Sequence, residues 1–202
     1  MTNEQQFWNW VAVNEARYNF LHQIEDGDER EQYLEELEQQ LHLYCENLYF
    51  EVGGYPDEKQ DLIITAQGDA DFFNDAESLV KQAPNLQHWN VIALKPAVKG
   101  SSIEYDNIRL NAEDMSFIPL NNNNSQKIGL RVYVDNYNPV DKESFINATY
   151  LIVDNLLGEK SSAMDIGYIE IENRPPISER NELIELSKLP AYVKWKKNKT
   201  TA

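Results

Sequence analysis

The sequence predicts an α+β protein, because its apolar residues change period along the chain. In residues 1–47 they recur every three or four positions, which is the period of an amphipathic helix. From residue 48 onwards, short aromatic and β-branched runs alternate with helical patterns in the order strand, strand, helix, strand. This order occurs twice. We therefore expect an N-terminal helical hairpin followed by two ββαβ-like halves forming a mostly antiparallel sheet with helices packed on it.

The helical hairpin is expected in residues 1–47. Its first helix spans about 4–24 and its second about 29–46, and the short acidic turn between them is typical of an αα-hairpin. A two-residue step on a helix turns by about 200°, so Trp8 and Trp10 cannot both face the core. An exposed tryptophan would be a binding anchor, and we take Trp8 as that candidate.

The two ββαβ halves are assigned to residues 48–96 and 115–176. Each half begins with a hairpin, which leads through an Asp- and Asn-rich loop into a helix, and a strand returns. The expected strands are 48–52, 62–66, 90–94, 115–120, 127–134 and 167–171, and the expected helices are 72–83 and 142–157, the latter ended by Gly158. Because residue identity between the halves is slight, we interpret them as an internal structural repeat without a sequence repeat.

The remaining segments are a connector over 97–114, with a short strand at 103–110, and a C-terminal part over 177–202. The C-terminal part is expected to hold a short helix over 179–189, with Ser178 as its N-cap and Pro190 beyond its end, and then a basic tail. We expect the tail to be solvated. We assign all 202 residues to one domain, because a chain of this length can bury one core.

The net charge excludes some partners. The chain has 18 Lys and Arg against 34 Asp and Glu, a formal charge of −16. A general nucleic-acid binder needs a basic face, and an anionic membrane surface attracts basic segments, so we expect neither. No apolar run approaches the roughly 18 residues of a membrane span, and the N-terminus does not resemble a secretory signal. The single cysteine, Cys45, cannot form an internal disulfide, and we expect a cytoplasmic protein.

The acidic residues are concentrated near the N-terminus. Residues 1–47 hold eleven acidic and two basic residues, a local charge of −9. From Lys188 to the end there are five lysines and no acidic residue. The solvent faces of the N-terminal helices would therefore attract a basic protein partner. We take Glu35, Glu36 and Glu38 as candidate partner-binding residues.

Motifs of catalysis are absent from the sequence. It has no phosphate-binding glycine motif, no nucleophile elbow and no C-x-x-C or H-E-x-x-H zinc signature. His42 and Cys45 lie three residues apart on an expected helix, but two ligands do not make a zinc site. We interpret them as a surface histidine beside a core-edge cysteine, and we expect no cofactor.

Aspartates follow the second strand of each half. Asp69 and Asp71 occupy this place in the first half, and Asp135 and Asp141 in the second. Carboxylates at sheet ends can hold a hard cation through oxygen ligands. Asp and Asn also cap helix N-termini, and their charge complements the helix dipole. We favour capping and keep these four as candidate metal ligands.

Two functions follow. The first is a non-enzymatic protein-binding or regulatory module that binds a basic partner, as an immunity-like neutraliser of a basic toxin or nuclease would. The alternative is a metal-dependent hydrolase or small-ligand enzyme, which requires the Asp-rich loops to converge. A third explanation is that the charge serves solubility alone. Oligomeric state does not follow from the sequence.

Overall fold

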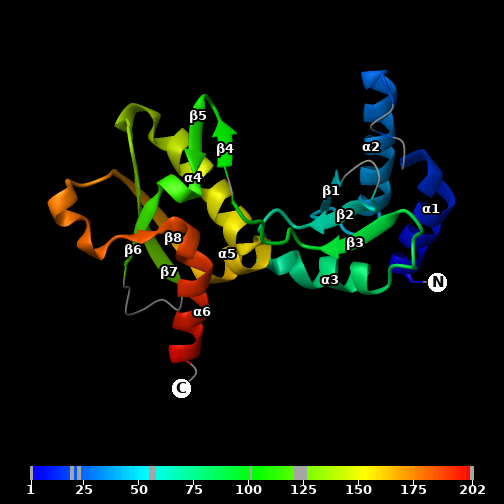
Figure 1. Ribbon diagram of the computed structural model, residues 1–202. Helices are drawn as coiled ribbons and strands as arrows, with labels where there is room; N and C mark the ends of the chain where they lie inside the picture. Colours follow the sequence, from blue (N-terminus) through cyan, green and yellow to red (C-terminus); the bar gives the residue numbers. More distant parts are fainter. Residues whose placement is uncertain are drawn as a thin grey trace. The chain divides into compact units, whose positions relative to one another are not determined.

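The structure is a computed structural model that describes residues 2–18, 21, 24–54, 58–100, 102–120 and 127–200. The chain divides into two compact units, Met1–Lys95 and Pro96–Ala202. Each unit packs helices on a mixed sheet, so the expected α+β class is confirmed (Figure 1). The assignment of both units to one domain stays a prediction.

The first unit begins with the expected helical hairpin, α1 (Asn3–Tyr18) and α2 (Gly27–His42). Helix α1 ends at Tyr18, and four of the residues expected to extend it, 19, 20, 22 and 23, lie outside the described residues. Helix α2 begins at a conventional cap, because the Asp26 side chain accepts hydrogen bonds from the backbone N–H groups of Asp28 and Glu29.

The sheet of the first unit contains β1 (Tyr49–Gly53), β2 (Gln60–Thr65) and β3 (Trp89–Ala93), in the order β1-β2-β3. Strand β1 is antiparallel to β2, and β3 is parallel to β2. A parallel pair needs a crossover. Here the short 3₁₀ helix Ala70–Phe72 and helix α3 (Phe73–Lys81) supply it.

Trp8 lies in the core of the first unit and is not an exposed anchor. Its side chain is 3% exposed, and its indole Nε1–H donates a 2.7 Å hydrogen bond to the backbone oxygen of Leu79 in α3. The choice of Trp8 as a surface residue was therefore wrong. The expectation that the two tryptophans do not both face the core agrees with the structure, because Trp10 is less buried than Trp8.

The second unit opens with a hairpin of β4 (Ser102–Tyr105) and β5 (Ile108–Asn111), where one strand over 103–110 was expected. The two turn residues between them, Asp106 and Asn107, have φ angles of 49° and 63°. Two consecutive positive φ angles match the twist of the strands on either side, and Asp and Asn adopt them more easily than most residues. The single-strand expectation missed this turn.

The main sheet of the second unit has the order β8-β7-β6-β9. Its strands are β6 (Ser116–Leu120), β7 (Ile128–Val134), β8 (Ile166–Asn173) and β9 (Ile184–Glu185). Strand β7 is antiparallel to β6 and parallel to β8, so both units contain a hairpin followed by a parallel strand. The internal repeat stays a prediction.

Helices α4 (Lys142–Leu157) and α5 (Glu159–Asp165) connect β7 to β8. Helix α4 buries Phe145, Ile152 and Val153 in the same core as Leu130 and Val132 of β7. Gly158 ends α4 with a φ of 75°, as the sequence predicted for a C-terminal glycine.

The C-terminal part differs from the expectation. The expected helix over 179–189 does not form: a 3₁₀ segment (Ile177–Glu182), β9 and a 3₁₀ turn (Leu186–Lys188) occupy residues 179–188 except Leu183. Helix α6 (Leu189–Thr200) then carries the lysines, so Pro190 stands in its first turn, where proline is tolerated. Leu189 and Val193 are buried in the core, whereas Lys194, Trp195 and Lys199 of the expected basic tail are exposed, so the tail is helical but its side chains are solvated as expected.

None of the helices among the described residues is long and apolar enough to span a membrane.

Candidate protein-binding groove

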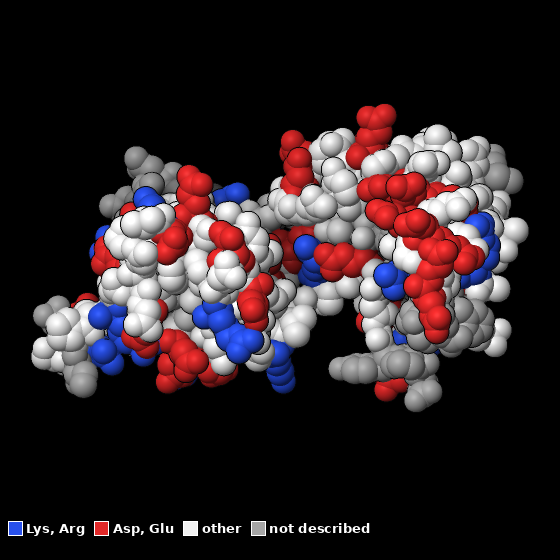
Figure 2. All heavy atoms as spheres, turned by 90° about the horizontal axis from the view of Figure 1, so that it is seen from above, with Lys and Arg blue, Asp and Glu red and all other residues white. Residues whose placement is uncertain are grey.

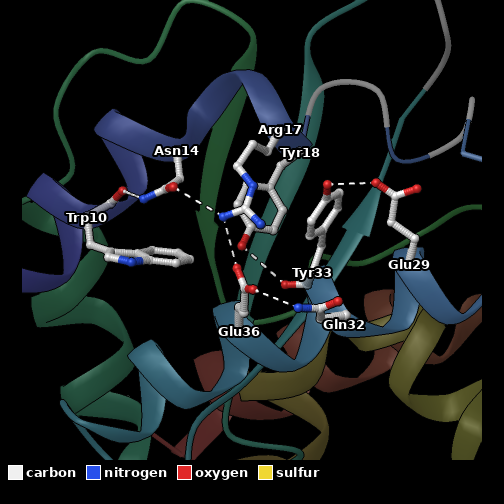
Figure 3. A network of polar contacts seen from close by, with 8 residues as sticks. All are labelled: Trp10, Asn14, Arg17, Tyr18, Glu29, Gln32, Tyr33 and Glu36. Carbon is white, nitrogen blue, oxygen red and sulfur yellow. Dashed lines mark hydrogen bonds and ion pairs between the residues drawn. The ribbon is translucent and has the colours of Figure 1, made fainter.

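A network of polar contacts fixes α1 against α2 in the first unit (Figure 3). Arg17 Nη1 of α1 lies 2.9 Å from Glu36 Oε2 of α2, and the Arg17 guanidinium lies 4.4 Å from the centre of the Tyr33 ring. Asn14 Oδ1 accepts a 3.4 Å hydrogen bond from the same guanidinium. Arg17 therefore neutralises one glutamate of α2 and orients the acidic helix.

Tyr18 completes this network from the apolar side. Its hydroxyl donates a 3.1 Å hydrogen bond to the backbone oxygen of Tyr33, and its ring lies against the rings of Trp10 and Tyr33. The side chain is 4% exposed. Burial disfavours the charged phenolate and raises the pKa of Tyr18 to about 12.

A groove of about 800 Å³ lies between α2 and β1, on the other side of α2 from this network. One wall comes from α2, where Glu31, Glu35 and Glu38 line the groove with Leu34. The spacing of these residues by three and four positions places them on one side of the helix. Glu31 and Glu35 are exposed, and Glu38 is half-buried.

The charge of the groove is negative. Three glutamates line it, and Arg30 is the one lysine or arginine among its described lining residues. Acidic side chains also predominate over lysine and arginine on the face of the first unit that Figure 2 shows. Carboxylates that lie within about 10 Å of one another act together on an approaching charge. The groove therefore favours a cationic ligand.

The floor of the groove is apolar and comes from β1. Tyr49, Phe50 and Val52 are half-buried and line it together with Gly53. Strand β1 is at the edge of its sheet, since β2 is its one neighbour among the described strands. An acidic wall above an apolar floor suits a ligand that carries both positive charge and apolar groups.

The three glutamates predicted from the sequence to bind a partner do not all line the groove. Glu35 and Glu38 line the groove, whereas Glu36 is bound to Arg17 and also accepts a hydrogen bond from Gln32. The sequence did not indicate the floor residues as part of a site. The sequence predicted a strand at residues 48–52. It did not show that this strand lies at the edge of its sheet or beside α2, because both depend on contacts between distant parts of the chain.

The predicted aspartates make local contacts. Asp69 accepts a hydrogen bond from the Asp71 backbone N–H at 3.1 Å and caps the 3₁₀ helix before α3, as the capping interpretation expects. Asp141 Oδ2 accepts a hydrogen bond from Asn138 Nδ2, and Asp135 Oδ2 lies 3.3 Å from Arg174 Nη1. Asp71 is exposed. The four aspartates are divided between the two units.

A second, more polar cleft of about 670 Å³ lies in the second unit, between the β4–β5 hairpin and the end of β7. Asp114, Asp135 and Asn136 line it, and Asn136 has a positive φ of 61°. Among the residues that the structure describes, no group of three or more His, Cys, Asp or Glu side chains could hold a metal ion.

His42 is the last residue of α2, and Cys45 follows it by three residues. Cys45 is half-buried, and the His42 ring packs edge-on against Tyr49 at 5.9 Å between ring centres. His42 Nε2 is buried and has no hydrogen-bond partner among the described residues. Cys45 is at the edge of the core as expected, but His42 packs against Tyr49 with its Nε2 atom buried and is not the surface histidine expected from the sequence.

Compared with models of protein families, with curated proteins and with solved structures, the chain gives no match. Function is therefore inferred from the geometry of the two units.

Proposed function

We propose that the protein is a non-enzymatic protein-binding module whose first unit takes a basic segment of a partner into the groove between α2 and β1. The observation that carries the proposal is the convergence of Glu31, Glu35 and Glu38 on one wall above an apolar floor. A charged wall attracts and orients the partner, and the apolar floor contributes the burial that holds it.

The charge of the chain supports the same function. The whole chain carries −16, and residues 1–47 carry −9, so a basic partner is steered toward α2 from a distance. An immunity-like or otherwise regulatory protein works by such association, because masking the basic surface of a partner needs no catalytic group. The cytoplasmic setting expected from the single Cys45 stays part of this proposal.

The proposal is tested with two labelled heptapeptides of the same length and apolar content, Lys-Val-Lys-Val-Lys-Val-Lys and Glu-Val-Glu-Val-Glu-Val-Glu. When the full chain is titrated into each labelled peptide, fluorescence anisotropy should show binding of the lysine peptide and no binding of the glutamate peptide. The Kd should rise about tenfold between 50 and 300 mM NaCl, because screening weakens attraction between exposed charges.

A matched pair of charge reversals locates the binding site. Glu35→Lys should weaken the lysine peptide at least about tenfold, since it reverses a charge in the groove. Glu46→Lys makes the same change at an exposed residue of the same unit outside the groove lining, and should change the Kd less than about twofold. Equal effects of the two variants would show attraction by net charge alone and would contradict the proposal.

A further inference from the structure

We infer that the basic segment binds in extended form, as an added strand on the free edge of β1. The inference rests on the proposed function and specifies how the groove is used. Among the described strands, β1 pairs with β2 alone, so its opposite edge has no strand neighbour. Figure 1 shows α2 standing beside β1 and running on past the sheet, so the helix forms a wall next to this edge.

The pairing register indicates which backbone groups of β1 face the open edge. In β2, the Ile64 backbone oxygen accepts a 2.8 Å hydrogen bond from Leu94 N–H, and the Gln60 N–H donates a 2.9 Å bond to the His88 oxygen. These two residues therefore direct their backbone groups toward β3. Because successive residues of a strand direct their backbone groups to opposite sides, Ile63 directs its N–H and C=O groups toward β1.

The same alternation continues into β1. Ile63 is opposite Glu51, so Glu51 and its second neighbours Tyr49 and Gly53 form the hydrogen-bonded pairs with β2. The intervening residues, Phe50 and Val52, must direct their N–H and C=O groups away from β2. Both residues line the groove. An incoming strand would find two donors and two acceptors there.

The side chains that line the groove determine what kind of strand can bind to this edge. An added strand gains main-chain hydrogen bonds from the edge and specificity from side-chain contacts. Lysine or arginine side chains would meet Glu31, Glu35 and Glu38, and apolar side chains would meet Leu34 and the floor. An extended segment with alternating basic and apolar residues satisfies both.

A second copy of this chain is a poorer occupant. Exposed edge strands tend to pair with one another, and natural proteins oppose this with charge. Two copies meeting edge to edge would bring the three groove glutamates of each against those of the other, and each chain carries −16. The acidic wall therefore disfavours self-pairing and favours a basic strand.

Amide hydrogen exchange, followed by NMR on the full chain with and without saturating lysine peptide, tests the inference. The expected result is that exchange of the Phe50 and Val52 amides slows at least tenfold on binding, while Tyr49 and Glu51, already paired with β2, change less than twofold. Peptide binding without slower exchange at Phe50 and Val52 would overturn the added strand and leave the proposed function intact. If the peptide does not bind at all, both are overturned.

A second measurement uses the peptide backbone. In a strand, alternate N–H groups point to the same side, so one set faces β1. Two N-methylated versions of the lysine peptide each remove one set of these N–H groups. One version is methylated at the three valines, and the other at the lysines in positions 3, 5 and 7. At least one version should bind tenfold more weakly than the parent peptide. Equal Kd values for all three peptides would contradict strand addition.

Discussion

Arg17 Nη1 of α1 lies 2.9 Å from Glu36 Oε2 of α2, and the same guanidinium covers the Tyr33 ring at 4.4 Å (Figure 3). This contact connects the two helices of the hairpin. It also separates Glu36, which is neutralised within the unit, from the three glutamates that line the groove. The hairpin therefore orients the acidic wall as well as contributing to the core.

A double-mutant cycle measures this ion pair. Because both side chains are about one-third exposed, at 38% and 33%, solvent screens the pair, and we expect a coupling of about 0.5 kcal/mol between Arg17→Met and Glu36→Gln. Urea denaturation of the four proteins gives the value. The Arg109–Glu104 pair, at 80% and 67% exposed, is the control, with a coupling near zero. Equal coupling for both pairs would contradict the role of Arg17.

Tyr18 makes the first unit sensitive to alkali. Its pKa is raised to about 12, whereas an unfolded tyrosine loses its proton near pH 10. Between these values the unfolded state binds fewer protons than the folded state, so the free energy of unfolding falls as pH rises. The stabilisation is complete below pH 10, and about 2 kcal/mol of it is lost by pH 12.

The comparison of wild type with Tyr18→Phe isolates this effect from the titrating lysines. Urea denaturation at pH 8 and pH 11.5 should give a smaller loss for Tyr18→Phe, although the variant is less stable at pH 8 because it lacks the bond to Tyr33. Tyr44, whose pKa burial also raises to about 12, stays in both proteins. The same loss in both proteins would argue against Tyr18 as the cause.

Trp8 connects α1 to α3 through the hydrogen bond to Leu79. Trp8→Phe removes that bond and leaves a cavity, and we expect the free energy of unfolding to fall by about 2 kcal/mol. Trp195→Phe is the matched control, because this tryptophan of α6 is 50% exposed and should cost about 0.5 kcal/mol or less. Thermal or urea unfolding measures both, and an equally small effect at Trp8 would contradict its burial.

Asp69 distinguishes capping from metal binding. As a cap, its replacement in Asp69→Ala should lower the free energy of unfolding by about 1 kcal/mol, to the same extent with or without millimolar Mg²⁺ or Mn²⁺. The metal-dependent alternative instead expects these ions to stabilise the wild type and not the variant, since a ligand that binds the folded state raises stability. Thermal unfolding with and without each metal separates the two.

The elements with strong local patterns were predictable from the sequence. The apolar patterns of α2, α4 and β7 agree with the structure because each helix packs one consistent face into a core, and β7 buries every residue except Arg131. The C-terminal part was not predictable in this way. Proline marks both the end of a helix and its first turn, so Pro190 did not reveal that α6 begins there.

The candidate site was predictable in part for a related reason. Glu35 and Glu38 follow from the solvent face of an amphipathic helix, which the sequence displays directly. Phe50 and Val52 read as ordinary strand residues, because their edge position depends on which strands pair. Trp8 was misplaced because helical periodicity separates the two tryptophans without saying which one faces the core.

The most direct test of the groove is a charge swap. The variant Glu31→Lys, Glu35→Lys, Glu38→Lys converts the acidic wall into a basic one, and circular dichroism with thermal unfolding checks that it folds. Anisotropy titrations should show that it loses the lysine peptide by at least about tenfold and gains the glutamate peptide, which the wild type does not bind. If the folded variant bound the lysine peptide with the Kd of the wild type, the groove would not be the binding site.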